Sequence, residues 1–153
     1  MRKKEKEITA KSEIEKILKN NTVCRIALSE NNMPYIVPMS YGYEEGKLYL
    51  HCAKEGKKLD IIRKNSRVCF EVSDSIELIK ADIPCKFSTK FRSLIGTGNI
   101  EIAEDRNMVK KGLEIIMQQH AGTEQWEFPE KIYDHVHILV IRIDNVTGKK
   151  SGI

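Results

Sequence analysis

The chain contains six or seven short strand-like segments, and most of them follow one another with only a turn between. The clearest are VCRIALS (23–29), the pair inside PYIVPMSYGYEEGKLYLHCA (34–53), RVCFEVSD (67–74), FRSLIGTGNIEIAED (91–105) and HVHILVIRIDNVTGKK (135–150). Consecutive strands usually pair as antiparallel neighbours, and a sheet of many short strands avoids exposed edges best by closing on itself. The sequence therefore predicts a mainly β fold, an antiparallel β-barrel of six to seven strands with flanking helices.

Three segments outside these strands have helical spacing. The first begins near Thr9 or Ser12, either of which can cap it, and a pair of asparagines ends it. The others are LDIIRKN (59–65), after the third strand, and RNMVKKGLEIIMQQH (106–120), before the last. SIELIKADIPCKFSTK (75–90) has a proline and no clean period, which predicts mostly connecting chain.

Length and composition predict one globular domain over residues 1–153. The 153 residues are 41% hydrophobic and 31% charged, which argues against the disordered, fibrous and membrane classes. No apolar run approaches the roughly 18 residues of a membrane helix, and the start of the chain lacks the apolar core of a secretory signal. We therefore expect a cytoplasmic protein with no membrane partner.

Charge and residue spacing exclude several function classes. The net charge of +4 is mild, and the aromatic residues form no base-stacking platform, so we expect no nucleic-acid partner. The four cysteines lack metal-ligand spacing. His135 and His137 would share one face of a strand, but no third ligand is identifiable, and we predict no metal site. The nucleophile-elbow, P-loop and dinucleotide fingerprints are absent.

The stretch YLHCAKEGKKLD (49–60) is the best candidate for a binding site. A strand delivers His51, the small residues Ala53 and Gly56 allow close backbone approach, and a helix begins near Lys57 or Lys58. Free N–H groups and a positive dipole end at such a junction bind anions, although a solvated turn with a charged first helical turn has the same pattern. His51 is open to the same two interpretations, chemistry or hydrogen-bonded structure.

Two prolines favour an unusual second strand. Pro34 and Pro38 lack backbone N–H groups, which indicates a strand edge, a bulge or a strand end at this point. The backbone near Pro38 is then free to face something other than a neighbouring strand.

Taken together, these segments resemble a known family. The ordered motifs are P-x-x-V-P-x-S/N-[FY] at Pro34–Tyr41, H-[SC]-A-x-x-G-x-K-x-D at His51–Asp60 and R-S-[VL]-I-x-x-G at Arg92–Gly98. They closely resemble the Nim-type nitroimidazole-resistance proteins, which belong to the pyridoxamine 5'-phosphate oxidase-like FMN-binding split barrels. The resemblance covers residues from about 1 to 150.

The resemblance implies a homodimer with FMN at the subunit interface. The FMN phosphate is expected at the turn of Gly56, Lys57 and Lys58, with Arg92 or Ser93 as further donors. The remaining expected cofactor-binding residues, which would run beside the flavin ring or complete its wall, are Val37, Pro38, Met39, Ser40, Tyr41, His51, Cys52 and Ala53. Arg25 fits either the family pattern or a salt bridge at the barrel mouth.

The implied activity is that of an FMN-dependent oxidoreductase of the nitroreductase type, which reduces a nitroimidazole-like or other small-molecule electron acceptor. His51 is the expected catalytic residue, as proton donor or substrate-orienting group. The alternatives are a pyridoxamine 5'-phosphate oxidase-like oxidase and a non-catalytic flavin- or haem-binding sensor or storage protein. Trp126 and Phe128 either cover the flavin or fill a dimer core, and Tyr41 and Tyr43 either contact the ring or pack.

Overall fold

The computed structural model describes residues 3–122 and 125–153. Its strands form one antiparallel sheet in the order β3-β2-β6-β7-β8-β5-β4, with β1 beside β8. The strands are β1 (Glu7–Ile8), β2 (Val23–Glu30), β3 (Met33–Ser40), β4 (Gly42–Glu44), β5 (Lys47–Ala53), β6 (Arg67–Ile79), β7 (Ser88–Ala103) and β8 (Val136–Ser151). The helices are α1 (Lys11–Asn20), α2 (Lys57–Lys64), α3 (Arg106–Ala121) and α4 (Ile132–His135).

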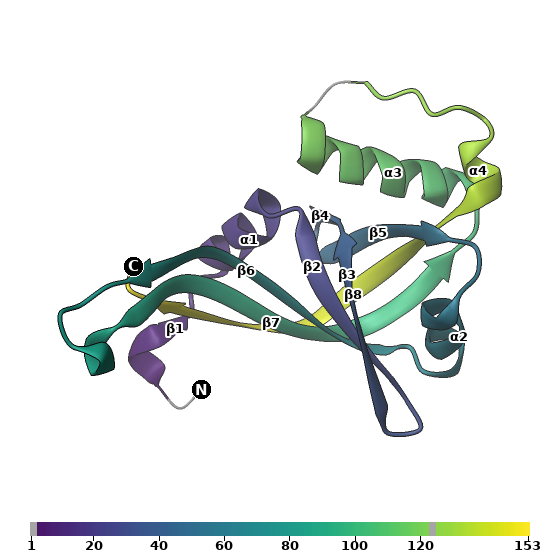
Figure 1. Cartoon of the computed structure of the whole chain (residues 1–153). Coiled ribbons are helices and arrows are strands. Elements are labelled where there is room, and N and C mark those ends of the chain that lie inside the picture. The colour runs from purple at the N-terminus through teal and green to yellow at the C-terminus, as the bar shows by residue number, and fades with distance from the viewer. Residues whose placement is uncertain (1–2, 123–124) are drawn as a thin grey trace.

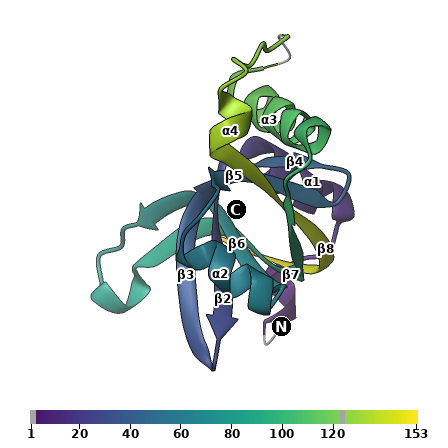
Figure 2. The same ribbon diagram turned by 90° about the vertical axis from the view of Figure 1, so that its right-hand side faces the viewer.

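The sheet closes through one bent strand. β3 and β4 lie at opposite ends of the strand order, yet only Tyr41 separates them in the chain. The first part of this strand pairs with β2 and the second part with β5, so the strand lies along both edges of the sheet. Figure 2 shows the strands curving round in this way, with α2 in front of one end. The predicted antiparallel barrel is confirmed, and it carries a seam where the bent strand changes partners.

Two apolar clusters stabilise the fold. The larger one fills the barrel and takes alternate residues of each strand, such as Leu48, Leu50 and Cys52 of β5. The smaller one lies on the outer face, where α3 crosses β5 and β8. Gly112 allows this close approach, because a Cβ there would lie 2.7 Å from the side chain of Ile138.

The β6–β7 hairpin extends well beyond the barrel. Its ladder continues from Glu77 paired with Lys90 to Ile79 paired with Ser88, after a register shift that follows Asp74. Figure 1 shows this hairpin projecting away from α2 and α3. The prediction that residues 75–90 are mostly connecting chain is therefore wrong at both ends. Only the tip, with a short 3-10 helix at Pro84–Lys86, is irregular.

The predicted helices are present, with corrections at their ends. α1 ends at Asn20 as expected, but Ala10 is its N-cap, without a side-chain hydrogen bond, so neither Thr9 nor Ser12 caps it. The sequence pattern missed β1 and the single turn of α4. Because α4 contains His135 and β8 contains His137, these two histidines do not share a strand.

None of the described helices is both long and apolar enough to cross a membrane. Within residues 3–122 and 125–153, no group of three or more metal-ligating side chains comes together.

Candidate functional site

The bent strand opens a split between β3 and β5. Its β4 part pairs with β5 as far as Gly42 opposite Tyr49. Continuing this register would place Ser40 opposite His51, but at Tyr41 the chain leaves β5 and its β3 part pairs with β2 instead. The end of β5 keeps only β8 as a strand partner among the described residues. We call the two facing segments, 36–40 of β3 and 51–53 of β5, the split.

β3 has unpaired backbone groups on the side of the split. The N–H of Tyr41 donates to the carbonyl of Thr22, 3.0 Å away, and in an antiparallel ladder this bonding recurs at every second residue. Pro34, Pro38 and Ser40 have the opposite parity, so their backbone groups turn away from β2. The prolines thus remove no donor from the β2 ladder. Of the three predicted possibilities, an edge, a bulge or a strand end, the structure shows the edge. The open edge carries the N–H groups of Ile36 and Ser40 and the carbonyls of Ile36, Pro38 and Ser40.

A turn and a helix N-terminus lie at the end of β5. Gly56 is the N-cap of α2 with φ 127° and ψ 164°, a backbone conformation that favours glycine. Its carbonyl accepts from the N–H groups of Leu59 (2.9 Å) and Asp60 (3.3 Å), and no side chain caps the helix. The N–H groups of Lys57 and Lys58 precede these bonds and are free to bind an anion. The structure confirms the predicted strand-to-helix junction.

The two lysines of this junction lie toward different sides of the split. Nζ of Lys57 is 4.8 Å from the ring centroid of Tyr35, on β3. Lys58 is half-buried and close enough to Cys52, on β5, to affect its thiol. Burial raises the pKa of the Cys52 thiol, and the positive charge of Lys58 opposes this rise. An anion at the turn would therefore meet positive charge on both sides of the split.

Side chains of the predicted site alternate between solvent and core. His51, Ala53 and Pro38 are exposed, and Val37 and Ser40 are half-buried. Met39 and Cys52 are buried in the barrel, and by the same ladder parity their backbone groups face β2 and β8, so neither residue lines the split. The structure thus brings the predicted residues together but gives Met39 and Cys52 a packing role.

Tyr41 packs in the core. Its side chain is fully buried, and its hydroxyl donates to the carbonyl of Leu18 at 2.7 Å. Burial raises the pKa of this hydroxyl, and the nearby Cys24 thiol raises it by a smaller amount. The prediction that Tyr41 binds the cofactor is wrong for its side chain, which locks the bend of the strand onto α1.

Arg92 and Ser93 do not reach the turn within one chain. Arg92 donates to both carboxylate oxygens of Asp74, at 2.8 and 2.9 Å. Burial opposes ionisation of Asp74, but the hydrogen bonds from Arg92 and Asn21 outweigh it and lower the pKa of the carboxyl. Ile100 marks the end of β7 that lies near α2. It is eight residues beyond Arg92, and eight strand residues span roughly 26 Å. The length of β7 keeps these two residues away from the turn of their own chain. The expectation that they bind the phosphate applies to a homodimer, and it stays a prediction.

Three positions with open interpretations have structural contacts. Arg25 forms an exposed ion pair with Glu71 at 3.1 Å, which matches the salt-bridge interpretation. Phe128 packs against the cluster beneath α3, and Trp126 Nε1 donates to the Gly122 carbonyl at 3.5 Å. In one chain, Trp126 and Phe128 belong to the α3 side of the barrel.

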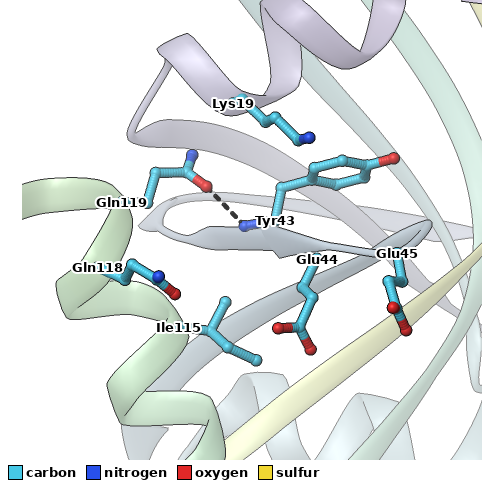
Figure 3. Close-up of a pocket in the computed structure, with 7 residues that line it drawn as sticks. All are labelled: Lys19, Tyr43, Glu44, Glu45, Ile115, Gln118 and Gln119. Carbon is cyan, nitrogen blue, oxygen red and sulfur yellow. Dashed lines mark hydrogen bonds between the residues drawn. The ribbon is translucent and has the colours of Figure 1, made fainter. Parts of the chain in front are cut away.

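Sequence reasoning missed a pocket between α1, β4 and α3, shown in Figure 3. It has a volume of about 390 Å³ and contains Tyr43 and Gln119 among its lining residues. The Gln119 side chain accepts from the Tyr43 N–H at 2.7 Å and donates to the carbonyls of Leu18 (3.0 Å) and Asn21. These bonds join residues 76 to 101 positions apart in the sequence, so no local sequence pattern predicts them. Gln119 fastens three elements together, and Tyr43 packs at this joint, away from the split.

Comparison with known proteins shows where this arrangement recurs. Residues 10–150 match the family model described as pyridoxamine 5'-phosphate oxidase. A protein from Bacteroides thetaiotaomicron, named as a candidate 5-nitroimidazole antibiotic resistance protein, is 30% identical, with a TM-score of 0.82 over 94% of this chain and 85% of that one. A FAD-binding protein from Mesorhizobium loti is 26% identical, with a TM-score of 0.68 over 94% of this chain and 96% of that one.

A more distant structure shares the fold alone. The flavocytochrome Anf3 of Azotobacter vinelandii is 17% identical, with a TM-score of 0.83 over 96% of this chain and 70% of that one. None of the curated proteins matches the chain closely.

Proposed function

Because the chain belongs to the pyridoxamine 5'-phosphate oxidase-like split-barrel family, we propose that it binds a flavin in the split and uses it as an oxidoreductase of the nitroreductase type. The cofactor proposed is FMN. Its ring would lie between β3 and β5, and its phosphate would meet the turn of Gly56, Lys57 and Lys58. One observation carries the proposal. The unpaired edges of β3 and β5 lie beside the N-terminus of α2, which has no side-chain cap and begins with two lysines.

The residues present fit such a cofactor. The pyrimidine edge of a flavin ring carries both hydrogen-bond donors and acceptors, and the open edge of β3 offers both kinds of group through Ile36, Pro38 and Ser40. The phosphate is an anion, and the Lys57 and Lys58 N–H groups and side chains supply donors and positive charge. Ala53 and Gly56 add little bulk, so they allow a ligand to approach the backbone closely.

The bound flavin would supply hydride or single-electron transfer. The chain contributes position and protons. His51 is the exposed titratable side chain on the β5 arm of the split, where its imidazole can donate a proton to an acceptor or orient it. Lys57 and Lys58 bind only. The cytoplasmic location expected from the sequence stays a prediction.

Anaerobic reoxidation tests the activity. Protein loaded with FMN is reduced with dithionite, mixed with a 5-nitroimidazole, and followed by the absorbance of oxidised flavin. We expect rapid reoxidation with the nitroimidazole and none with buffer, at a rate above that of free reduced FMN. Reduced flavin that stays bound and unchanged would contradict the reductase proposal and favour a protein that binds flavin without turnover.

Replacing His51 with Ala should separate binding from chemistry. We expect FMN to stay bound, since His51 lies outside the phosphate turn, while reoxidation by the nitroimidazole slows roughly 100-fold, a typical contribution of one acid–base group. Stopped-flow absorbance gives the rate. His135→Ala, an exposed histidine at the end of α4, is the matched control and should react at the wild-type rate. Equal rates for His51→Ala and wild type would show that His51 is structural.

We further propose that two copies pair through the β6–β7 hairpin. Large apolar side chains gather on its outer half, where Ile76 is 68% exposed and Leu78 58% exposed; the others are Ile79, Ile83 and Phe87. Several large exposed apolar side chains in one region are typical of a protein interface. A second copy is the proposed occupant because it could also bring Arg92 and Ser93, which cannot reach the turn of their own chain, to the flavin.

The double variant Ile76→Asp, Leu78→Asp tests this pairing. Two carboxylates in an apolar interface are costly to desolvate, so we expect the dissociation constant of the dimer to rise at least 100-fold. Sedimentation velocity measures the change. Met108→Asp, an exposed methionine on α3, should leave the oligomeric state unchanged. A wild-type protein that sediments as a monomer would refute the dimer.

A further inference from the structure

Two side chains in the last turn of α3 contact the bend at which one strand passes from β5 to β2. Gln119 accepts from the N–H of Tyr43 at 2.7 Å. His120 Nε2 lies 3.1 Å from the carbonyl oxygen of Tyr41. We propose that Gln119 and His120 are positioning residues of the flavin site, which hold the open edge of β3 in place and so set the affinity and the reduction potential of the bound flavin. The inference rests on the proposed flavin site and adds residues that do not touch the flavin.

These two side chains take the place of a strand at the bend. The N–H of Tyr41 donates to the carbonyl of Thr22, on the side of β2, and Tyr43 has the same parity, so its backbone groups face that side too. The β2–β3 ladder starts with Val23 opposite Ser40, so it ends short of both tyrosines. The two α3 side chains therefore satisfy backbone groups that would bond to β2 if that strand were longer.

The amide of Gln119 ties the bend to the chain that leads into β2. Its oxygen accepts from Tyr43, as Figure 3 shows, and its nitrogen donates to the carbonyls of Leu18 (3.0 Å) and Asn21. A carbonyl can only accept, so the Nε2 atom of His120 carries the proton in its bond to the bend. The bend is thus fastened to the end of α1 and to the end of α3 at once.

A glycine at the bend allows α3 to come this close. A Cβ at Gly42 would lie 2.7 Å from the carbonyl oxygen of Ile115, so the backbones of the strand and the helix are in contact. Binding sites keep a defined geometry when the residues behind the ligand-contacting groups are held in this way. The last turn of α3 is therefore a rigid support for the bend.

The bend determines where the open edge of β3 lies. Ser40 belongs to this edge and directly precedes Tyr41. N–H groups of the edge would bind the reduced flavin ring more tightly than the oxidised ring, because the reduced ring is anionic at neutral pH. A bend released from α3 should weaken binding of the reduced flavin most and lower its reduction potential. The phosphate turn lies at the opposite end of the split, where Lys57 contacts Tyr35, and should be unaffected.

Variants at both positions test the proposal. His120→Leu and Gln119→Met roughly keep the size of each side chain and remove its hydrogen bonds. We expect each variant to bind FMN roughly tenfold more weakly in a fluorescence titration. The midpoint potential of the bound FMN should fall by about 30 mV, which is a further tenfold loss of affinity for the reduced form in a two-electron couple. His120→Gln, whose amide nitrogen can donate at the same place, should restore both values.

Two controls separate the ends of the split. Riboflavin lacks the phosphate, so the ratio of its dissociation constant to that of FMN should be the same in wild type and in the variants. Gln118→Met replaces an exposed glutamine in the same turn of α3 and should keep the wild-type affinity and potential. Circular dichroism shows whether each variant is folded. If Gln119→Met is not, His120→Leu decides alone, because His120 is exposed.

The possible results separate this inference from the proposed function. Wild-type affinity and potential in His120→Leu and Gln119→Met would overturn the inference and leave the proposed flavin site standing. Weaker FMN binding with an unchanged potential, or no recovery in His120→Gln, would show a merely structural role and also overturn it. Failure of wild type to bind any flavin would overturn both.

Discussion

Replacing Lys58 with Glu is expected to weaken flavin binding by roughly 1,000-fold. Lys58 lies in the first turn of α2, where its half-buried side chain adds positive charge on the β5 side of the turn. The electrostatic energy between two unit charges in contact near a protein surface is about 4 kcal/mol. A change of about 1.4 kcal/mol in the free energy of binding changes the affinity tenfold. A glutamate would turn this attraction into repulsion of the phosphate. Fluorescence titration with FMN measures the loss.

The matched control for this charge reversal is Lys16→Glu. Lys16 is an exposed lysine on α1, remote from the α2 N-terminus, and its replacement changes the net charge of the protein by the same amount. We expect its affinity for FMN to stay within a factor of two of wild type in about 0.15 M salt, where distant surface charges are screened. Circular dichroism should show both variants folded. Normal FMN binding by Lys58→Glu would remove the phosphate from this turn.

Replacing Gly98 with Ala should lower the free energy of unfolding by about 3 kcal/mol, because the strand has no room for a side chain there. A Cβ at Gly98 would lie 2.2 Å from the carbonyl oxygen of Arg142, so the backbone of β7 or β8 must move. The β7–β8 register shifts at this residue. For a domain of this size, the loss corresponds to a fall in melting temperature of roughly 6 to 12 °C, measured by calorimetry.

The neighbouring residue provides the control for this substitution. Thr97 is exposed on the same strand, and Thr97→Ala should cost about 1 kcal/mol or less. The comparison separates loss of strand propensity from the clash at Gly98. If Gly98→Ala melts within one degree or so of Thr97→Ala, the two long strands are not packed as closely as the structure has them.

Much of the fold could be predicted because its elements have local causes. Alternating apolar residues specify the strands, and the apolar faces of α1 and α3 specify those helices. The outer half of the β6–β7 hairpin was missed for the same reason. Its apolar residues, such as Ile76 and Leu78, are exposed, so their spacing does not mark a buried face.

The candidate site could be predicted only in part. Pro34 and Pro38 indicate an edge, a bulge or a strand end, and Gly56 with its lysines indicates an anion site or a solvated turn, because each signal is local. The split itself arises where one strand changes partners at Tyr41, which depends on pairing with β2 and β5 together. The bonds of Gln119 and the ion pair of Arg92 with Asp74 likewise join distant parts of the chain, and a single sequence does not reveal them.

A crystal structure of the protein grown with FMN tests the central claim most directly. We predict one flavin per chain, with its ring along residues 36–40 of β3 and its phosphate against the N–H groups of Lys57 and Lys58. Density for a flavin at another place, or crystals from saturating FMN that show the split without any flavin, would contradict the account.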